Sequence, residues 1–171
     1  FFNNNRLFFD FRFSALEQNS YVPTLVNSFK ITKNLILTSK LYTFSYKKTT
    51  PQIIGLGFKY FSYSEDDLNW ITSIQKVDLK GLIDYRLSSI ILNITKNLNF
   101  NNIEIFYGIG SNFYKLKSYN LYNDIPIQIE RQINYIDINF LIKFNMLNFI
   151  ISLISNSNNN MASFGIQKGV F

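Results

Sequence analysis

The chain has 171 residues with neither cysteine nor histidine, and its 17 Lys and Arg outnumber 11 Asp and Glu, giving a net charge of +6. The lack of cysteine excludes disulfides, zinc–thiolate sites and cysteine nucleophiles. The lack of histidine removes the commonest general base and metal ligand. We therefore expect no enzymatic activity, no cofactor and no metal site. The length suits one domain over residues 1–171, and the 18 Phe and 11 Tyr favour β-strands.

Ten strands are predicted along the chain, because segments with a period of two alternate with turn residues. In chain order they are 6–16, 24–32, 35–47, 52–63, 68–78, 82–94, 102–116, 132–143, 147–155 and 161–171. Most are near the roughly 9–11 residues of a tilted membrane-crossing strand. An even number of strands places both chain ends on the same side of a barrel.

Four of these strands alternate clearly, namely 6–16, 52–63, 102–116 and 132–143. In the first, Phe9, Phe11 and Phe13 share one face, whereas Asp10 and Arg12 share the other. Four other segments carry apolar residues on both faces, which bulges or thick interior packing would explain. They are 35–46, 69–77, 85–94 and 147–155.

The pentapeptide "ITKNL" occurs twice, at 31–35 and 94–98. Each copy is predicted to close one strand and to open the next. The longest loop, 117–132, is predicted at the end of the barrel opposite the termini, as expected for an extracellular loop.

The strands "IIGLGFKYF" and "IEIFYGIGSNFY", the turn "ITKNL", the absence of Cys and the terminal Phe171 together resemble a small bacterial outer-membrane β-barrel, similar in style to those of Bacteroidota. The resemblance implies an all-β, antiparallel up-and-down transmembrane barrel of about ten strands, with eight as the alternative. It also implies a location in the bacterial outer membrane with both termini in the periplasm. The role implied is structural: an accessory subunit of a larger envelope complex for secretion or transport.

Three other functions stay open at this point. The first is a narrow channel that favours anions. The second is a soluble, lipocalin-like ligand-binding barrel, which has the same period with its apolar face inward. The third is a basic organellar or ribosomal subunit.

Eight charged residues are predicted to face the lumen as a polar network of ion pairs and hydrogen bonds, because unpaired charges in so narrow a space are costly. They are Asp10, Arg12, Lys59, Asp84, Arg86, Glu104, Asp137 and Lys143. The alternative is a permeation path of mixed charge, in which Arg12 and Lys143 favour anions.

Four lysines at the predicted outer strand ends are either a solvated rim or contacts to lipopolysaccharide phosphates: Lys47, Lys48, Lys115 and Lys117. Aromatic residues near strand ends suit interfacial girdles: Trp70, Tyr42, Tyr46, Tyr60, Tyr63, Tyr114 and Tyr119. The expected partners are outer-membrane lipids, lipopolysaccharide and other outer-membrane proteins. Nucleic acid is not expected, because the Lys residues are dispersed and no RNA-binding signature is present.

The last strand has one irregular feature. Its apolar positions Phe164 and Ile166 are out of step with Phe171. The pattern predicts either a register shift at Lys168–Gly169 or a Phe171 side chain that turns inward or packs at the rim.

Overall fold

The computed structural model describes residues 7–16, 20–43, 50–63, 68–82, 84–119, 127–145 and 147–170. They form ten strands: β1 (Leu7–Leu16), β2 (Ser20–Lys30), β3 (Leu35–Thr43), β4 (Gln52–Tyr63), β5 (Leu68–Lys80), β6 (Tyr85–Phe100), β7 (Ile103–Ser118), β8 (Gln128–Phe144), β9 (Leu147–Ser155) and β10 (Asn160–Val170). No helix in these ranges has the length and apolar character needed to cross a membrane.

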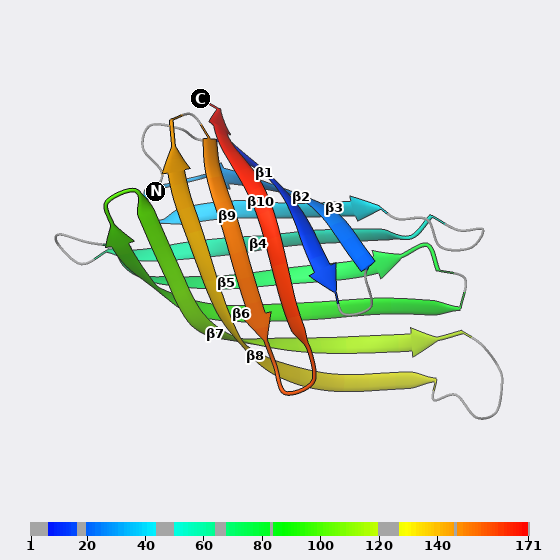
Figure 1. The fold of residues 1–171 in the computed structure, drawn as a ribbon. Helices are drawn as coiled ribbons and strands as arrows, with labels where there is room; N and C mark the ends of the chain where they lie inside the picture. Colours follow the sequence, from blue (N-terminus) through cyan, green and yellow to red (C-terminus); the bar gives the residue numbers. More distant parts are fainter. Residues whose placement is uncertain are drawn as a thin grey trace.

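The ten strands form one closed antiparallel barrel. Each strand pairs with its neighbours in the sequence, and β1 pairs with β10 to close the sheet. The first and last described residues, Leu7 and Val170, pair at one end of the barrel, which we call the terminal end, together with the β2–β3 and β6–β7 turns (Figure 1). The predicted fold class, with ten strands and not eight, is confirmed.

The barrel is apolar outside and polar inside. On β1, Phe9, Phe11 and Phe13 are 42–48% exposed, whereas Phe8 and Asp10 are 4% and 2% exposed. The same alternation holds on β4, β7 and β8, where Leu56, Ile109 and Ile136 are 59–66% exposed. An exposed belt of large aliphatic and aromatic side chains suits lipid, and it is the reverse of what a soluble barrel requires.

The two copies of "ITKNL" have different structures. The first forms a turn, in which the Thr32 hydroxyl accepts hydrogen bonds from the backbone N–H groups of Asn34 (3.2 Å) and Leu35 (3.0 Å). The second lies wholly within β6, so the turn predicted there is wrong. The chain reverses instead at 101–102, where Asn101 has a φ of 48°, a left-handed conformation that asparagine tolerates.

The strands differ greatly in length. β6, β7 and β8 have 16, 16 and 17 residues, whereas β3 and β9 have nine each. The long strands extend beyond the short ones at the end away from the termini (Figure 1). The predicted strands 82–94 and 132–143 were too short, because residues 95–100 and 128–131 continue the ladders.

The predicted register shift at Lys168–Gly169 is wrong. The β1–β10 register is continuous from Ala15↔Ala162 to Leu7↔Val170. Phe171 lies outside the described residues.

Candidate functional site: the barrel lumen

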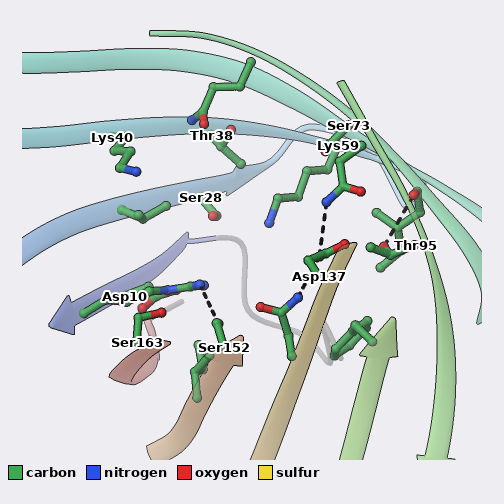
Figure 2. A pocket seen from close by; sticks show the side chains of 18 of the residues that line it. Asp10, Ser28, Thr38, Lys40, Lys59, Ser73, Thr95, Asp137, Ser152 and Ser163 are labelled. Atoms are coloured by element: carbon green, nitrogen blue, oxygen red, sulfur yellow. Dashed lines mark hydrogen bonds and ion pairs between the residues drawn. The ribbon is translucent and has the colours of Figure 1, made fainter. Parts of the chain in front are cut away.

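The lumen contains a cavity of about 330 Å³, lined by inward side chains from all ten strands. This volume has room for on the order of ten water molecules. We call it the lumen chamber. Figure 2 shows its polar wall, where charged and hydroxyl side chains from distant parts of the sequence face one another.

One side of the chamber is built around Asp10, which is 2% exposed. The Arg12 guanidinium donates from Nε (2.8 Å) and Nη2 (2.5 Å) to Asp10 Oδ2. Its Nη1 donates to Ser152 Oγ on β9 at 3.3 Å. The two charged residues lie two apart on β1, so they share the inner face. Arg12 thus compensates the buried carboxylate and ties β1 to β9 across β10.

The opposite side is built around Asp137 of β8, which is 4% exposed. Its Oδ2 accepts hydrogen bonds from Asn93 Nδ2 (3.2 Å) and Asn139 Nδ2 (2.9 Å). Among the described residues, its Oδ1 has no hydrogen-bond donor. The carboxylate is therefore solvated by amides and not by an ion pair, and its second oxygen is buried.

Two lysines reach the chamber between these carboxylates, Lys40 from β3 and Lys59 from β4 (Figure 2). Within the described ranges neither ammonium group forms an ion pair. Lys59 interacts electrostatically with Arg12, Asp10 and Asp137. The chamber thus has three cations against two carboxylates.

At the terminal end of the chamber lies a cluster of apolar side chains, which we call the plug. Its six residues are each 1–9% exposed and form one buried cluster: Ile36, Phe61, Ile71, Phe106, Leu141 and Ile150. Each lies within four residues of the strand end that faces the termini. Six strands therefore converge there on side chains that leave almost no surface accessible to water.

Beyond the plug, nearer the terminal end, a second polar layer includes an ion pair between Glu104 and Lys143. The Glu104 side chain is buried, whereas the Lys143 side chain is 42% exposed. Asn148 Nδ2 donates to Gln167 Oε1 at 3.2 Å, and Gln167 lines the chamber and pairs with Asp10 in the β1–β10 register. Polar side chains therefore continue past the plug along β10, whereas the six strands that carry the plug are apolar there.

Six of the eight predicted lumen residues lie on the inner face, and two do not. Arg86 is exposed and shares the outward phase of β6 with Ile90, and Asp84 is exposed just before that strand. The prediction failed there because β6 is apolar on both faces, so its phase was ambiguous. The inward phase carries Asn93, Thr95 and Asn97 instead.

The predicted headgroup lysines are partly described. Lys115 and Lys117 share the outward phase of β7 with exposed Phe113, and Lys115 Nζ is 2.7 Å from Glu130 Oε1. Lys47 and Lys48 lie outside the described residues.

The aromatic predictions separate into two groups. Trp70, Tyr60 and Tyr119 are 48–59% exposed, in keeping with a girdle, and Lys96 Nζ lies 5.8 Å from the Trp70 ring centroid. Tyr42 is buried and Tyr114 lies on the inner phase of β7, so these two do not face lipid. Tyr46 and the side chain of Tyr63 are outside the described part of the chain.

Sequence reasoning missed Lys40, Ser152 and the plug. All of them lie on inner faces and follow the inward phase of their strands. The sequence signal for them was the apolar or charged residues on the inner face of strands that are apolar on both faces. Among the described residues, no group of three or more Asp or Glu side chains is placed to hold a metal ion.

A closed ten-strand antiparallel barrel with an apolar belt and a polar lumen is the fold of bacterial outer-membrane β-barrels. Comparison with solved structures confirms this class. A KdgM porin in complex with disordered oligogalacturonate is similar with a TM-score of 0.53 and 11% identity, over 96% of this chain and 99% of that one. A bacterial polysaccharide outer membrane secretin is similar with a TM-score of 0.52 and 7% identity, over 99% of this chain and 77% of that one.

The outer membrane protein Omp33 of Acinetobacter baumannii is also similar, with a TM-score of 0.49 and 4% identity, over 97% of this chain and 98% of that one. No protein-family model and no curated protein matches the sequence. The two structures with TM-scores above 0.5 show the fold. At identities this low they define no subfamily.

Proposed function

We propose that this protein is a non-conducting outer-membrane barrel with a structural or accessory role and no enzymatic activity. The observation that carries the proposal is the apolar plug, because a pore for ions needs an open polar path and the plug narrows the lumen from six of its ten strands. In this proposal the termini are periplasmic and the long strands β6–β8 are extracellular. Lys115 and Lys117 would then lie where lipopolysaccharide phosphates are found.

Planar-bilayer recording tests the proposal directly. The wild-type barrel is expected to give no steady conductance. The double variant Phe61→Ala/Phe106→Ala removes two aromatic rings from the plug and is expected to open a measurable conductance. The matched control Phe9→Ala/Phe11→Ala removes two rings from the lipid face and is expected to stay silent. Steady conductance steps in the wild type would refute the closed barrel.

A second candidate is a narrow channel that favours anions. The specific observation for it is the excess of cations in the chamber, where Arg12, Lys40 and Lys59 face Asp10 and Asp137. The similar KdgM porin was solved with oligogalacturonate, which is an anionic sugar chain. If the wild type conducts, its reversal potential in a salt gradient should favour chloride, and Lys59→Gln should reduce that preference.

A further inference from the structure

The N-terminal half of β8, which lies farthest from the terminal end, pairs with a neighbouring strand on one side only. The β7–β8 register begins at Lys117↔Gln128. The β8–β9 register begins only at Ile136↔Ser155, because β9 ends there. In the described part of the chain, residues 128–135 therefore have β7 on one side and no strand on the other. We call these eight residues the free edge.

The backbone groups that face the open side can be assigned from one hydrogen bond. The Ser118 N–H donates to the Ile127 carbonyl at 3.0 Å, in the same register as the β7–β8 pairs. Residues of an antiparallel strand bond alternately to the two sides. The odd residues of the free edge therefore bond to β7. The N–H and C=O groups that point away from the sheet belong to Gln128, Glu130, Gln132 and Asn134.

The free edge lies at the end of the barrel away from the terminal end, and its outward side chains are polar. The same four even-numbered residues direct their side chains outward and are exposed. The next outward residue, Ile136, is 59% exposed and begins the apolar belt of β8. At about 3.4 Å per residue, eight residues give about 27 Å of unpaired strand.

Exposed edges usually carry features that prevent pairing, such as proline, lysine, a bulge or a very short strand. The sequence of the free edge, QIERQINY, contains no proline and no lysine. Its register with β7 is regular throughout. Arg131 is an inward charge, which is itself a feature that discourages pairing with an apolar strand, so the partner needs a polar side chain opposite it, as Tyr114 is in β7. The free edge therefore presents regular, unpaired backbone groups to which a further strand can bind.

We propose that the free edge binds an extended segment of another protein as an added β-strand. The backbone supplies four donors and four acceptors, and the side chains set the pattern of the partner. The residue opposite Ile129 is expected to be apolar, and the residues opposite Gln128 and Glu130 polar or basic, as Leu116, Lys117 and Lys115 are in β7.

A second copy of this barrel in the same membrane cannot supply the added strand. Barrel strands tilt by roughly 35–45° from the axis. Two copies related by rotation about the membrane normal would therefore cross their β8 strands at about 70–90°, and not antiparallel.

The probe is a synthetic peptide of residues 110–118, GSNFYKLKS, which in the chain already pairs with this stretch of β8. In that register Lys115 lies opposite Glu130, as in the folded protein. Fluorescence anisotropy with the full-length barrel in lipid nanodiscs is expected to show saturable binding. The matched control is the same peptide N-methylated at Phe113 and Lys115, which keeps every side chain and loses two donors. It is expected to bind at least tenfold more weakly.

A protein variant tests the same edge from the other side. Gln132→Pro removes an N–H that points to the open side and leaves the hydrogen bonds to β7 intact, whereas Gln132→Ala keeps the N–H. Binding is expected to fall at least tenfold in the proline variant and to remain near wild type in the alanine variant.

Two results would overturn the proposal. One is equal binding of the plain and N-methylated peptides. The other is slow hydrogen exchange at Glu130, Gln132 and Asn134 in the isolated protein, because the edge would then already be covered. Both measurements use the wild type, so they decide the question even if the proline variant does not fold.

Discussion

Two glycines on the inner face of β4 give a matched test of how tightly the barrel wall is packed. Gly55 and Gly57 are both buried, lie two residues apart and have no side chain. A Cβ at Gly57 would lie 2.5 Å from the Ile74 carbonyl oxygen and 2.9 Å from the Gln75 Cα. A Cβ at Gly55 would lie 3.2–3.4 Å from the side chains of three residues. Alanine at Gly57 therefore meets backbone, and alanine at Gly55 meets side chains that can move.

The expected free-energy difference follows from these distances. Overpacking that moves backbone costs about 1–3 kcal/mol. Gly→Ala substitution also restricts the unfolded chain, which stabilises the fold by about 0.4–1 kcal/mol at either position. That second contribution cancels when the two variants are compared. We therefore expect Gly57→Ala to be less stable than Gly55→Ala by about 2 kcal/mol, roughly a 30-fold change in the unfolding equilibrium.

Reversible urea unfolding in lipid vesicles measures this difference. Trp70 is the only tryptophan, so its fluorescence reports the transition without a label. Trp70 is 48% exposed on β5, away from both glycines on the outer face. Unfolding free energies of the two variants that agree within about 0.5 kcal/mol would show that the β4–β5 wall yields easily, and the packing argument would then fail.

Three further substitutions test other parts of the wall. Arg12→Met leaves the buried Asp10 carboxylate without its cation. The unfolding free energy in urea should therefore fall by about 3–5 kcal/mol. Adding Asp10→Asn to this variant should recover part of that loss. Asn27 has an outward side chain whose buried Oδ1 has no donor among the described residues, so Asn27→Leu should raise the unfolding free energy in vesicles by about 0.5–2 kcal/mol. Lys115→Ala removes an exposed ion pair with Glu130 and should change the unfolding free energy in urea by less than about 1 kcal/mol.

The fold followed from the sequence because an apolar belt imposes a strict period of two. Where one face is apolar over most of a strand, as in β1 and in residues 103–109 of β7, the phase and most boundaries were predictable. Residues 95–100 of β6 and 128–131 of β8 were not, because strand ends outside the apolar belt and loops have the same polar composition. The second "ITKNL" shows the limit of local pattern: Asn101 reverses the chain six residues later than expected, so the same pentapeptide lies in a strand.

The lumen was only partly predictable, for a different physical reason. Charges on clearly one-sided strands, such as Asp10, Arg12 and Asp137, could be placed because the opposite face is apolar. The plug could not, since Ile36 and Ile150 make their strands apolar on both faces and imitate an irregular strand. The register has its one described irregularity at Ser62/Tyr63. Thick interior packing, and not bulges, therefore explains the blurred alternation.

The plug and the free edge lie at opposite ends of the barrel, and this arrangement separates two functions that a barrel can combine. Transport requires a path through the lumen, which Phe61, Phe106 and their neighbours narrow. Strand capture requires only the unpaired backbone of residues 128–135, which projects beyond the belt. Removing the plug should therefore change conductance and leave peptide binding intact, whereas Gln132→Pro should do the reverse. A variant of either kind that changed both properties would show that the wall of β8 couples the two ends.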